Sequence, residues 1–166
     1  MKRQMRGVYV VEFAIIGLLL FILLFGVIEM GRLYFTVNAL NETVRRGARL
    51  AAVCDISDPR ILRRAIFNAA EDSGGSSLIG NLETADLTLS YLDGNGATVA
   101  APSDTSGADG FRAIRYVQLR VENFTFDLMI PVLGQQITLP AFRATLPRES
   151  LGRHAEEGVV PEITPC

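Results

Sequence analysis

The chain has few of the side chains that metal sites and nucleophilic catalysis need. Its 166 residues include one histidine and two cysteines. The cysteines belong to no CxxC or Cys/His group, so we expect no metal site. His154 lies in a polar segment without a nucleophile and an acid to complete a catalytic set, and no glycine-rich phosphate loop follows a strand-like segment. We therefore expect neither enzyme activity nor a cofactor.

The chain also lacks an excess of positive charge. Its formal net charge is −2, which gives no support to nucleic-acid binding. The charges are nevertheless polarised, because Lys2, Arg3 and Arg6 lie in the first seven residues with no acid beside them. The remaining residues hold thirteen bases against eighteen acids. The positive-inside rule predicts that the basic tip stays in the cytoplasm and that the remainder crosses a membrane.

Charge is absent altogether from residues 13–28, which are apolar apart from two glycines. Extended back to Val8, the run has 21 residues and only Glu12 interrupts it. A helix of that length rises about 32 Å, enough to cross a hydrocarbon core of about 30 Å. The sequence therefore predicts a transmembrane segment at about residues 8–28.

Three interpretations compete for this N-terminal region. A cleaved signal peptide needs an A-x-A-like site, but Glu29, Met30, Gly31 and Arg32 follow the apolar run. A simple uncleaved anchor tolerates Glu12 without explaining it, because a carboxylate near the end of a membrane helix costs less than one at its centre. The third interpretation gives Glu12 a role, and it rests on a resemblance.

Gly7, followed five residues later by Glu12 and then by an apolar helix, resembles the processing site of type IV prepilins. Residues 7–13 (GVYVVEF), 26–32 (GVIEMGR) and 46–52 (RGARLAA) together resemble the TadE-like family, the pilin-like minor proteins of tight-adherence (Flp-type) pilus systems. The resemblance implies that a prepilin peptidase cuts after Gly7, removes residues 1–7 as a leader and leaves Val8 as the new N-terminus. Its α-amino group, largely charged near neutrality, can pair with Glu12 of a neighbouring subunit, which relieves a buried charge.

The resemblance further implies a minor pilin or pseudopilin, because the chain is much longer than a major Flp pilin. Its expected partners are other pilin and minor pilin subunits, the prepilin peptidase, an inner-membrane assembly platform with its ATPase, and membrane lipid. We expect the chain in the bacterial inner membrane, crossing it once, with the domain of residues 54–166 in the periplasm or outside the cell. Residues 13–28 would supply the packing surface, chiefly Phe13, Gly17, Phe21, Phe25 and Gly26, although the two glycines also fit an ordinary membrane helix. The alternative function is an uncleaved, single-pass anchored domain that binds a partner in the periplasm.

The spacing of apolar residues predicts an α+β fold for the chain that follows the membrane segment. Apolar residues recur every three or four positions from Leu33 to Ala51, so the helix should continue, amphipathic, to about residue 53. Asp58 and Pro59 predict the cap and first turn of a small second helix. Its expected buried face is Leu62, Ala65, Ile66, Ala69 and Ala70.

The rest of the chain predicts an antiparallel sheet. Strand-like segments cover residues 86–92, 97–101, 114–123, 124–130 and 136–146. Between the first two, Asp93, Asn95 and Gly96 lack the further ligands of a calcium loop, so we expect a turn. Pro131 and Pro140 predict bends or edges. Residues 147–166 show little pattern, and we expect a loose tail.

Cys54 and Cys166 lie far apart in the sequence. In an exported domain they can close a loop of about 110 residues, and the chain-entropy model puts the stabilisation at roughly 4–5 kcal/mol. Two unpaired thiols remain the alternative.

Overall fold

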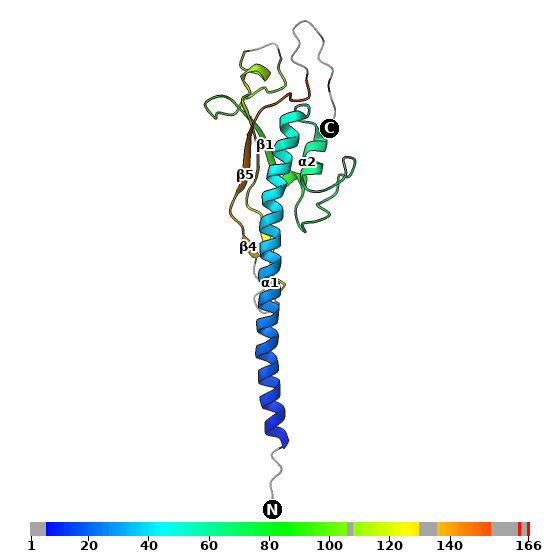
Figure 1. Ribbon diagram of the computed structural model, residues 1–166, viewed down its shortest axis with the longest axis vertical. Helices are drawn as coiled ribbons and strands as arrows, with labels where there is room; N and C mark the ends of the chain where they lie inside the picture. The colour runs from blue at the N-terminus through cyan, green and yellow to red at the C-terminus, as the bar shows by residue number, and fades with distance from the viewer. Residues whose placement is uncertain (1–5, 106–107, 130–135, 154–162, 164–165) are drawn as a thin grey trace, which may run out of the picture.

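A single long helix, α1 (Arg6–Val53), runs through the whole molecule. The computed structural model describes residues 6–105, 108–129, 136–153, 163 and 166. The helix has 48 residues, about 72 Å at 1.5 Å per residue. Its first half projects alone, and its second half carries the globular domain (Figure 1). The predicted continuation of the helix to Val53 is confirmed.

The globular domain contains a three-stranded antiparallel sheet in the order β1-β2-β5. These strands are β1 (Leu87–Leu92), β2 (Tyr116–Val121) and β5 (Phe142–Pro147). Short strands β3 (Thr125–Asp127) and β4 (Gln136–Thr138) pair separately. In the central strand, Val117, Leu119 and Val121 are fully buried, as their alternation with polar residues predicts.

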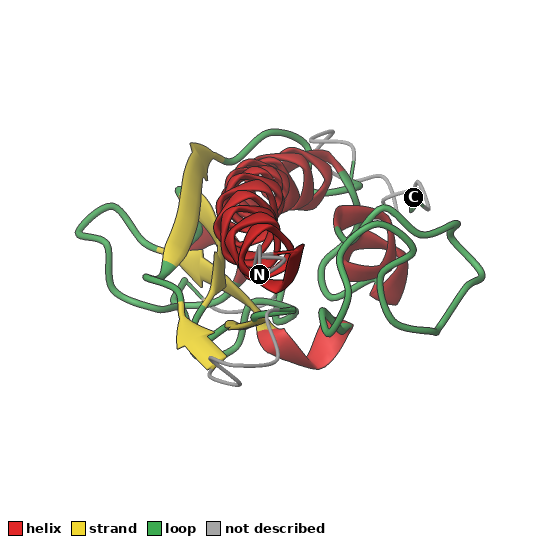
Figure 2. Cartoon of the chain, turned by 90° about the horizontal axis from the view of Figure 1, so that it is seen from below, coloured by secondary structure: helices red, strands yellow, loops and turns green. Residues whose placement is uncertain are grey.

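Helix α1 lies between this sheet and the second helix, α2 (Pro59–Ala65) (Figure 2). Leu40, Val44, Ala48 and Ala51 are the buried stripe of α1. They contribute to two hydrophobic clusters that the sheet and α2 complete. The α+β fold, with a long helix, a small helix and antiparallel sheets, is thus confirmed.

Helix α2 is shorter than its apolar pattern predicts. Asp58 caps it by accepting a hydrogen bond from the Arg60 amide, as expected. It ends at Ala65, because Phe67 takes a positive φ of 69°. The amide of the buried Asn68 side chain then donates to the carbonyls of Gly74 and Gly75, which turns the chain away. The predicted face past Ile66 is therefore wrong, and Ala69 is exposed.

Two strand predictions also need correction. Residues 97–101 form only an isolated bridge, between Thr98 and Leu92. The turn before them is confirmed, since the Asp93 carboxylate accepts hydrogen bonds from the amides of Asn95 and Ala97. Residues 136–146 form two strands rather than one, β4 and β5, with Pro140 in the bend between them. Pro131 lies outside the described residues.

The expectation of a loose tail after Pro147 is wrong for residues 148–153. The amides of Glu149 and Leu151 donate to the carbonyl of Ala52, and that of Gly152 donates to Val53. Leu151 is fully buried. These contacts occupy carbonyls that the end of a helix leaves without intrahelical partners. His154 and the rest of the tail up to residue 162, with residues 164 and 165, are outside the described part of the chain. Two short 3₁₀ turns, Thr84–Asp86 and Phe111–Ala113, complete the domain.

Candidate functional site

The projecting half of α1 is an apolar surface with no partner in the described chain. Every residue from Gly7 to Ile28 is exposed, apart from the half-buried Gly17 and Gly26. Among the described residues, α1 alone is long and apolar enough to cross a membrane. An apolar surface of this extent indicates contact with lipid or with other proteins.

Gly7 lies in the first turn of α1, where backbone amides have no intrahelical acceptor. Apart from Gly7 itself, its chain neighbours and the adjacent helix backbone, no described atom lies within 4 Å of the position that a Cβ would occupy there. In the part of the chain that the structure describes, no other side chain covers Gly7 at that position. Residues 1–5 of the expected leader lie outside the described part. Cleavage after Gly7 stays a prediction.

Glu12 lies one helical turn beyond Val8, on the same face of α1. Its side chain is exposed among apolar neighbours. It makes no ion pair or hydrogen bond with any other residue that the structure describes. The carboxylate is thus available to a charge from another molecule.

The expected packing residues are arranged along one slowly turning stripe, because Phe13, Gly17, Phe21 and Phe25 are spaced four residues apart. The three phenylalanines are exposed, and the rings of Phe21 and Phe25 stack with centroids 6.2 Å apart. Gly17 and Gly26 have open space where a Cβ would lie. The stripe is free to receive a neighbouring helix or lipid.

Directly after the apolar run, a charged pair joins α1 to the globular domain. Glu29 is buried and accepts two hydrogen bonds from Nη1 of Arg32, at 2.8 and 3.0 Å. The Met129 amide also donates to Glu29, at 3.3 Å. The Arg32 guanidinium lies 5.1 Å from the centroid of the Phe126 ring. This pair has a sequence signal, an acid and a base three residues apart on a helix, from which no role for the two residues was predicted.

Beside this junction lies an open groove of about 480 Å³ between α1, the loop at residues 78–81 and β3. Its polar lining includes Asn81 and Asp127, and the Asp127 carboxylate accepts hydrogen bonds from Asn81 and Gln136. Across the described ranges, no group of three His, Cys, Asp or Glu side chains is placed to hold a metal ion.

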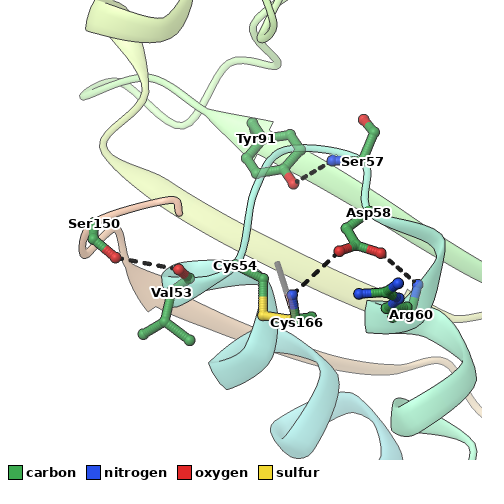
Figure 3. Close-up of a disulfide and its surroundings, with 8 residues drawn as sticks. All are labelled: Val53, Cys54, Ser57, Asp58, Arg60, Tyr91, Ser150 and Cys166. Carbon is green, nitrogen blue, oxygen red and sulfur yellow. Dashed lines mark hydrogen bonds between the residues drawn. A yellow bond between two sulfur atoms is a disulfide. The ribbon is translucent and has the colours of Figure 1, made fainter. Parts of the chain in front are cut away.

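At the far end of α1 the structure joins Cys54 to Cys166 in a disulfide (Figure 3). The Cα atoms are 5.4 Å apart. The Cys166 amide donates to Asp58 Oδ2, while Oδ1 of the same carboxylate caps α2. Nearby, the Ser57 amide donates to the Tyr91 hydroxyl. One loop therefore holds the end of α1, the start of α2 and residue 166 together.

Comparison with known proteins adds one finding to this geometry. A family model described as TadE-like protein matches residues 7–49. No curated protein and no solved structure matches the chain significantly. The matched segment includes Gly7, Glu12, the whole exposed apolar run and the Glu29–Arg32 pair. The TadE-like family is structural and pilus-associated, and an exposed apolar N-terminal helix fits a pilus-associated membrane protein. Through this helix the chain is similar to the TadE-like family.

Proposed function

We propose that the protein is a minor pilin or pseudopilin, a structural subunit of a tight-adherence (Flp-type) pilus or of a related secretion assembly. A prepilin peptidase cuts it after Gly7, and it assembles through its apolar N-terminal helix with other pilin subunits on an inner-membrane platform. The observation that carries the proposal is the half-helix of residues 7–28, which is apolar and exposed and lies within the TadE-like match.

The charges at the N-terminus support an assembly role. Cleavage after Gly7 creates a cationic α-amine on Val8, one turn from Glu12. A carboxylate without a partner in a membrane helix is costly. A neighbour's Val8 amine supplies the missing charge when subunits pack side by side. The same pairing therefore favours the assembled state over the isolated subunit.

The disulfide supports the proposed orientation. Disulfides persist in oxidising compartments such as the periplasm and are rare in the cytosol. Cys54 and Cys166 both lie in the globular domain. With the basic tip inside the cell, that domain is in the periplasm or on the outside.

The mature N-terminus is the first measurement. Mass spectrometry of the protein from membranes of its own host, with the prepilin peptidase active, should find a chain that starts at Val8. A chain that keeps residues 1–7 would contradict the proposal and leave an uncleaved anchored domain.

Two variants with matched controls separate processing from assembly. Gly7→Leu should block maturation, whereas Gly31→Leu, at another glycine of α1 with open space, should mature normally. Glu12→Gln should be cut but should enter the assembly poorly, because the neighbour's amine loses its partner. Glu42→Gln, at an exposed glutamate farther along the same helix, should assemble like the wild type. Normal maturation and assembly of Gly7→Leu and Glu12→Gln would refute the pilin function.

A further inference from the structure

We propose that the base of the globular domain contacts the lipid headgroup layer through an apolar collar around α1. The collar consists of Met30, Tyr34 and Phe35 of α1, Leu78, Met129 and Ile137. The inference rests on the proposed transmembrane segment and adds a second membrane contact, made by the folded domain itself.

All six collar residues are exposed large apolar side chains. Met129 is 69% exposed and Tyr34 is 65% exposed, the largest fractions in the set. Single exposed apolar side chains are ordinary on protein surfaces. A group of them at the same height along the axis of α1 indicates a contact with another molecule or with lipid.

The contacts of the junction place these residues at one level. Met129 donates its amide to Glu29, which directly follows the apolar run. Phe126 lies beside Arg32 and pairs with Ile137 in the β3–β4 ribbon. Leu78 and Phe35 line the same groove. The collar thus occupies the stretch of α1 between Glu29 and Thr36.

That stretch coincides with the membrane–water boundary. From Glu29 to Phe35 the helix rises about 9 Å. The headgroup layer on each side of a bilayer is on the order of 5–7 Å thick. If residues 8–28 span the hydrocarbon, the collar starts at the edge of that core and ends at the outer edge of the headgroups.

The collar surrounds the helix axis, which favours a planar partner. At about 100° per residue, Tyr34 is turned about 140° from Glu29, and Phe35 about 120° in the other direction. The domain contributes Met129 on the side of Glu29. A neighbouring subunit would cover one side of such a ring, whereas a lipid surface meets all of it.

The chemistry of the collar also fits lipid. Tyrosine is enriched at membrane interfaces, where its ring and hydroxyl meet both environments. Of the charges at this level, Glu29 and Arg32 neutralise one another, and the Asp127 carboxylate accepts hydrogen bonds from Asn81 and Gln136. Above the collar the exposed side chains of α1 become polar, namely Asn38, Asn41, Glu42 and Arg45. Between Asn38 and Arg49 the helix exposes no large apolar side chain, so the apolar exposure of its lower part ends where the headgroup layer ends.

The chain has no tryptophan, so the fluorescence of one introduced tryptophan reports the depth of that position in the bilayer. Met129→Trp and Tyr34→Trp test the collar in the full-length protein. Phe21→Trp, in the middle of the apolar run, is the control for the bilayer core. Tyr116→Trp is the control for a water-exposed position. Tyr116 is exposed and begins β2, whereas Val121 ends the same strand. Each variant is reconstituted at low density in phosphatidylethanolamine and phosphatidylglycerol vesicles.

We expect blue-shifted emission from Met129→Trp and Tyr34→Trp, and quenching by lipids brominated near the headgroup. Phe21→Trp should be quenched by lipids brominated deep in the chains, and Tyr116→Trp only by aqueous acrylamide. Acrylamide quenching of Met129→Trp equal to that of Tyr116→Trp, with Phe21→Trp still deep, would overturn the collar and leave the proposed function standing. A blue shift without quenching by lipid would show that protein covers the collar and would also overturn it. A Phe21→Trp outside the bilayer would refute the transmembrane segment, and the collar with it.

Discussion

Gly47 lies where α1 approaches both β2 and α2. A Cβ at this position would overlap the Leu119 side chain and come within 2.8 Å of the Ala65 Cβ. Leu119 and Ala65 are fully buried, so neither can move into solvent. Because glycine has no side chain, α1, α2 and β2 can pack closely at this position. The same glycine lowers the stability of the helix itself.

Gly47→Ala should lower the free energy of unfolding by about 1–3 kcal/mol, because overpacking outweighs the better helix propensity of alanine. Chemical unfolding of the full-length protein in detergent measures the change. Gly31→Ala, where the added methyl meets open space, should be neutral or gain up to about 1 kcal/mol. Equal stability of the two variants would contradict the close approach.

Tyr91 links pH to stability at the top of the domain. Burial raises the pKa of its hydroxyl above 10.0, with a smaller raising effect from the Asp55 charge, while the hydrogen bond from Ser57 opposes them. The folded state therefore prefers the protonated phenol. Its contribution to stability is complete below about pH 10, the pKa of an unfolded tyrosine, and is lost as pH rises through the folded pKa.

Tyr91→Phe should cost about 1 kcal/mol near neutral pH, because the Ser57 amide loses its acceptor. It should also reduce the alkaline loss of stability. Unfolding curves at about pH 8 and about pH 11 check both effects. Tyr116→Phe, at an exposed tyrosine, should keep the alkaline loss. An unchanged pH profile in Tyr91→Phe would rule out this linkage.

At the scale of elements, the Glu29–Arg32 pair holds the β3–β4 ribbon against α1. Glu29→Gln keeps the acceptor for the Met129 amide but weakens the bonds from Arg32, by about 1 kcal/mol. Amide exchange of residues 125–129 should then rise about fivefold. Hydrogen exchange read by mass spectrometry measures this opening. Glu122→Gln, which breaks a half-exposed pair with Arg120, should leave exchange in this segment unchanged.

For the whole molecule, the disulfide joins residues 112 positions apart. Replacing both cysteines by alanine should lower the free energy of unfolding by roughly 4–5 kcal/mol in the chain-entropy model. Thermal unfolding in detergent, with and without a thiol reductant, tests this. The reductant should destabilise the wild type and leave the double variant unchanged. Free thiols detected by alkylation of the unreduced wild type would contradict the bridge.

Local sequence pattern predicted the elements that depend on local or repeated interactions. The apolar run and the amphipathic stripe up to Ala51 predicted α1, since the spacing of apolar residues along the chain shows the period of a helix. Alternation predicted β2. The turn residues 93–96 predicted a hairpin with a second strand at residues 97–101, where only one bridge forms. A turn signal shows where the chain can reverse, and it does not show how far the returning segment pairs.

The candidate site also combines features that the sequence showed with features that only the structure showed. The spacing of Gly7 and Glu12 was readable directly, because both lie on one helix and the structure adds only their exposure. The role of Glu29 was hidden, since the Met129 amide that it binds lies one hundred residues away. The order of residues 148–153 was likewise hidden, because it comes from the core position of Leu151 and from carbonyls at the end of α1.

Three features of the protein follow from the amino-acid order alone, namely a basic tip, an apolar helix long enough to span a bilayer, and a separate α+β domain. Hydrophobic length and helix periodicity are local properties and need no partner to be recognised. The tertiary structure alone decided which surfaces remain open and at what level the domain meets the helix. Those features depend on contacts between distant residues, such as Glu29 with Met129, Gly47 with Leu119 and Cys54 with Cys166.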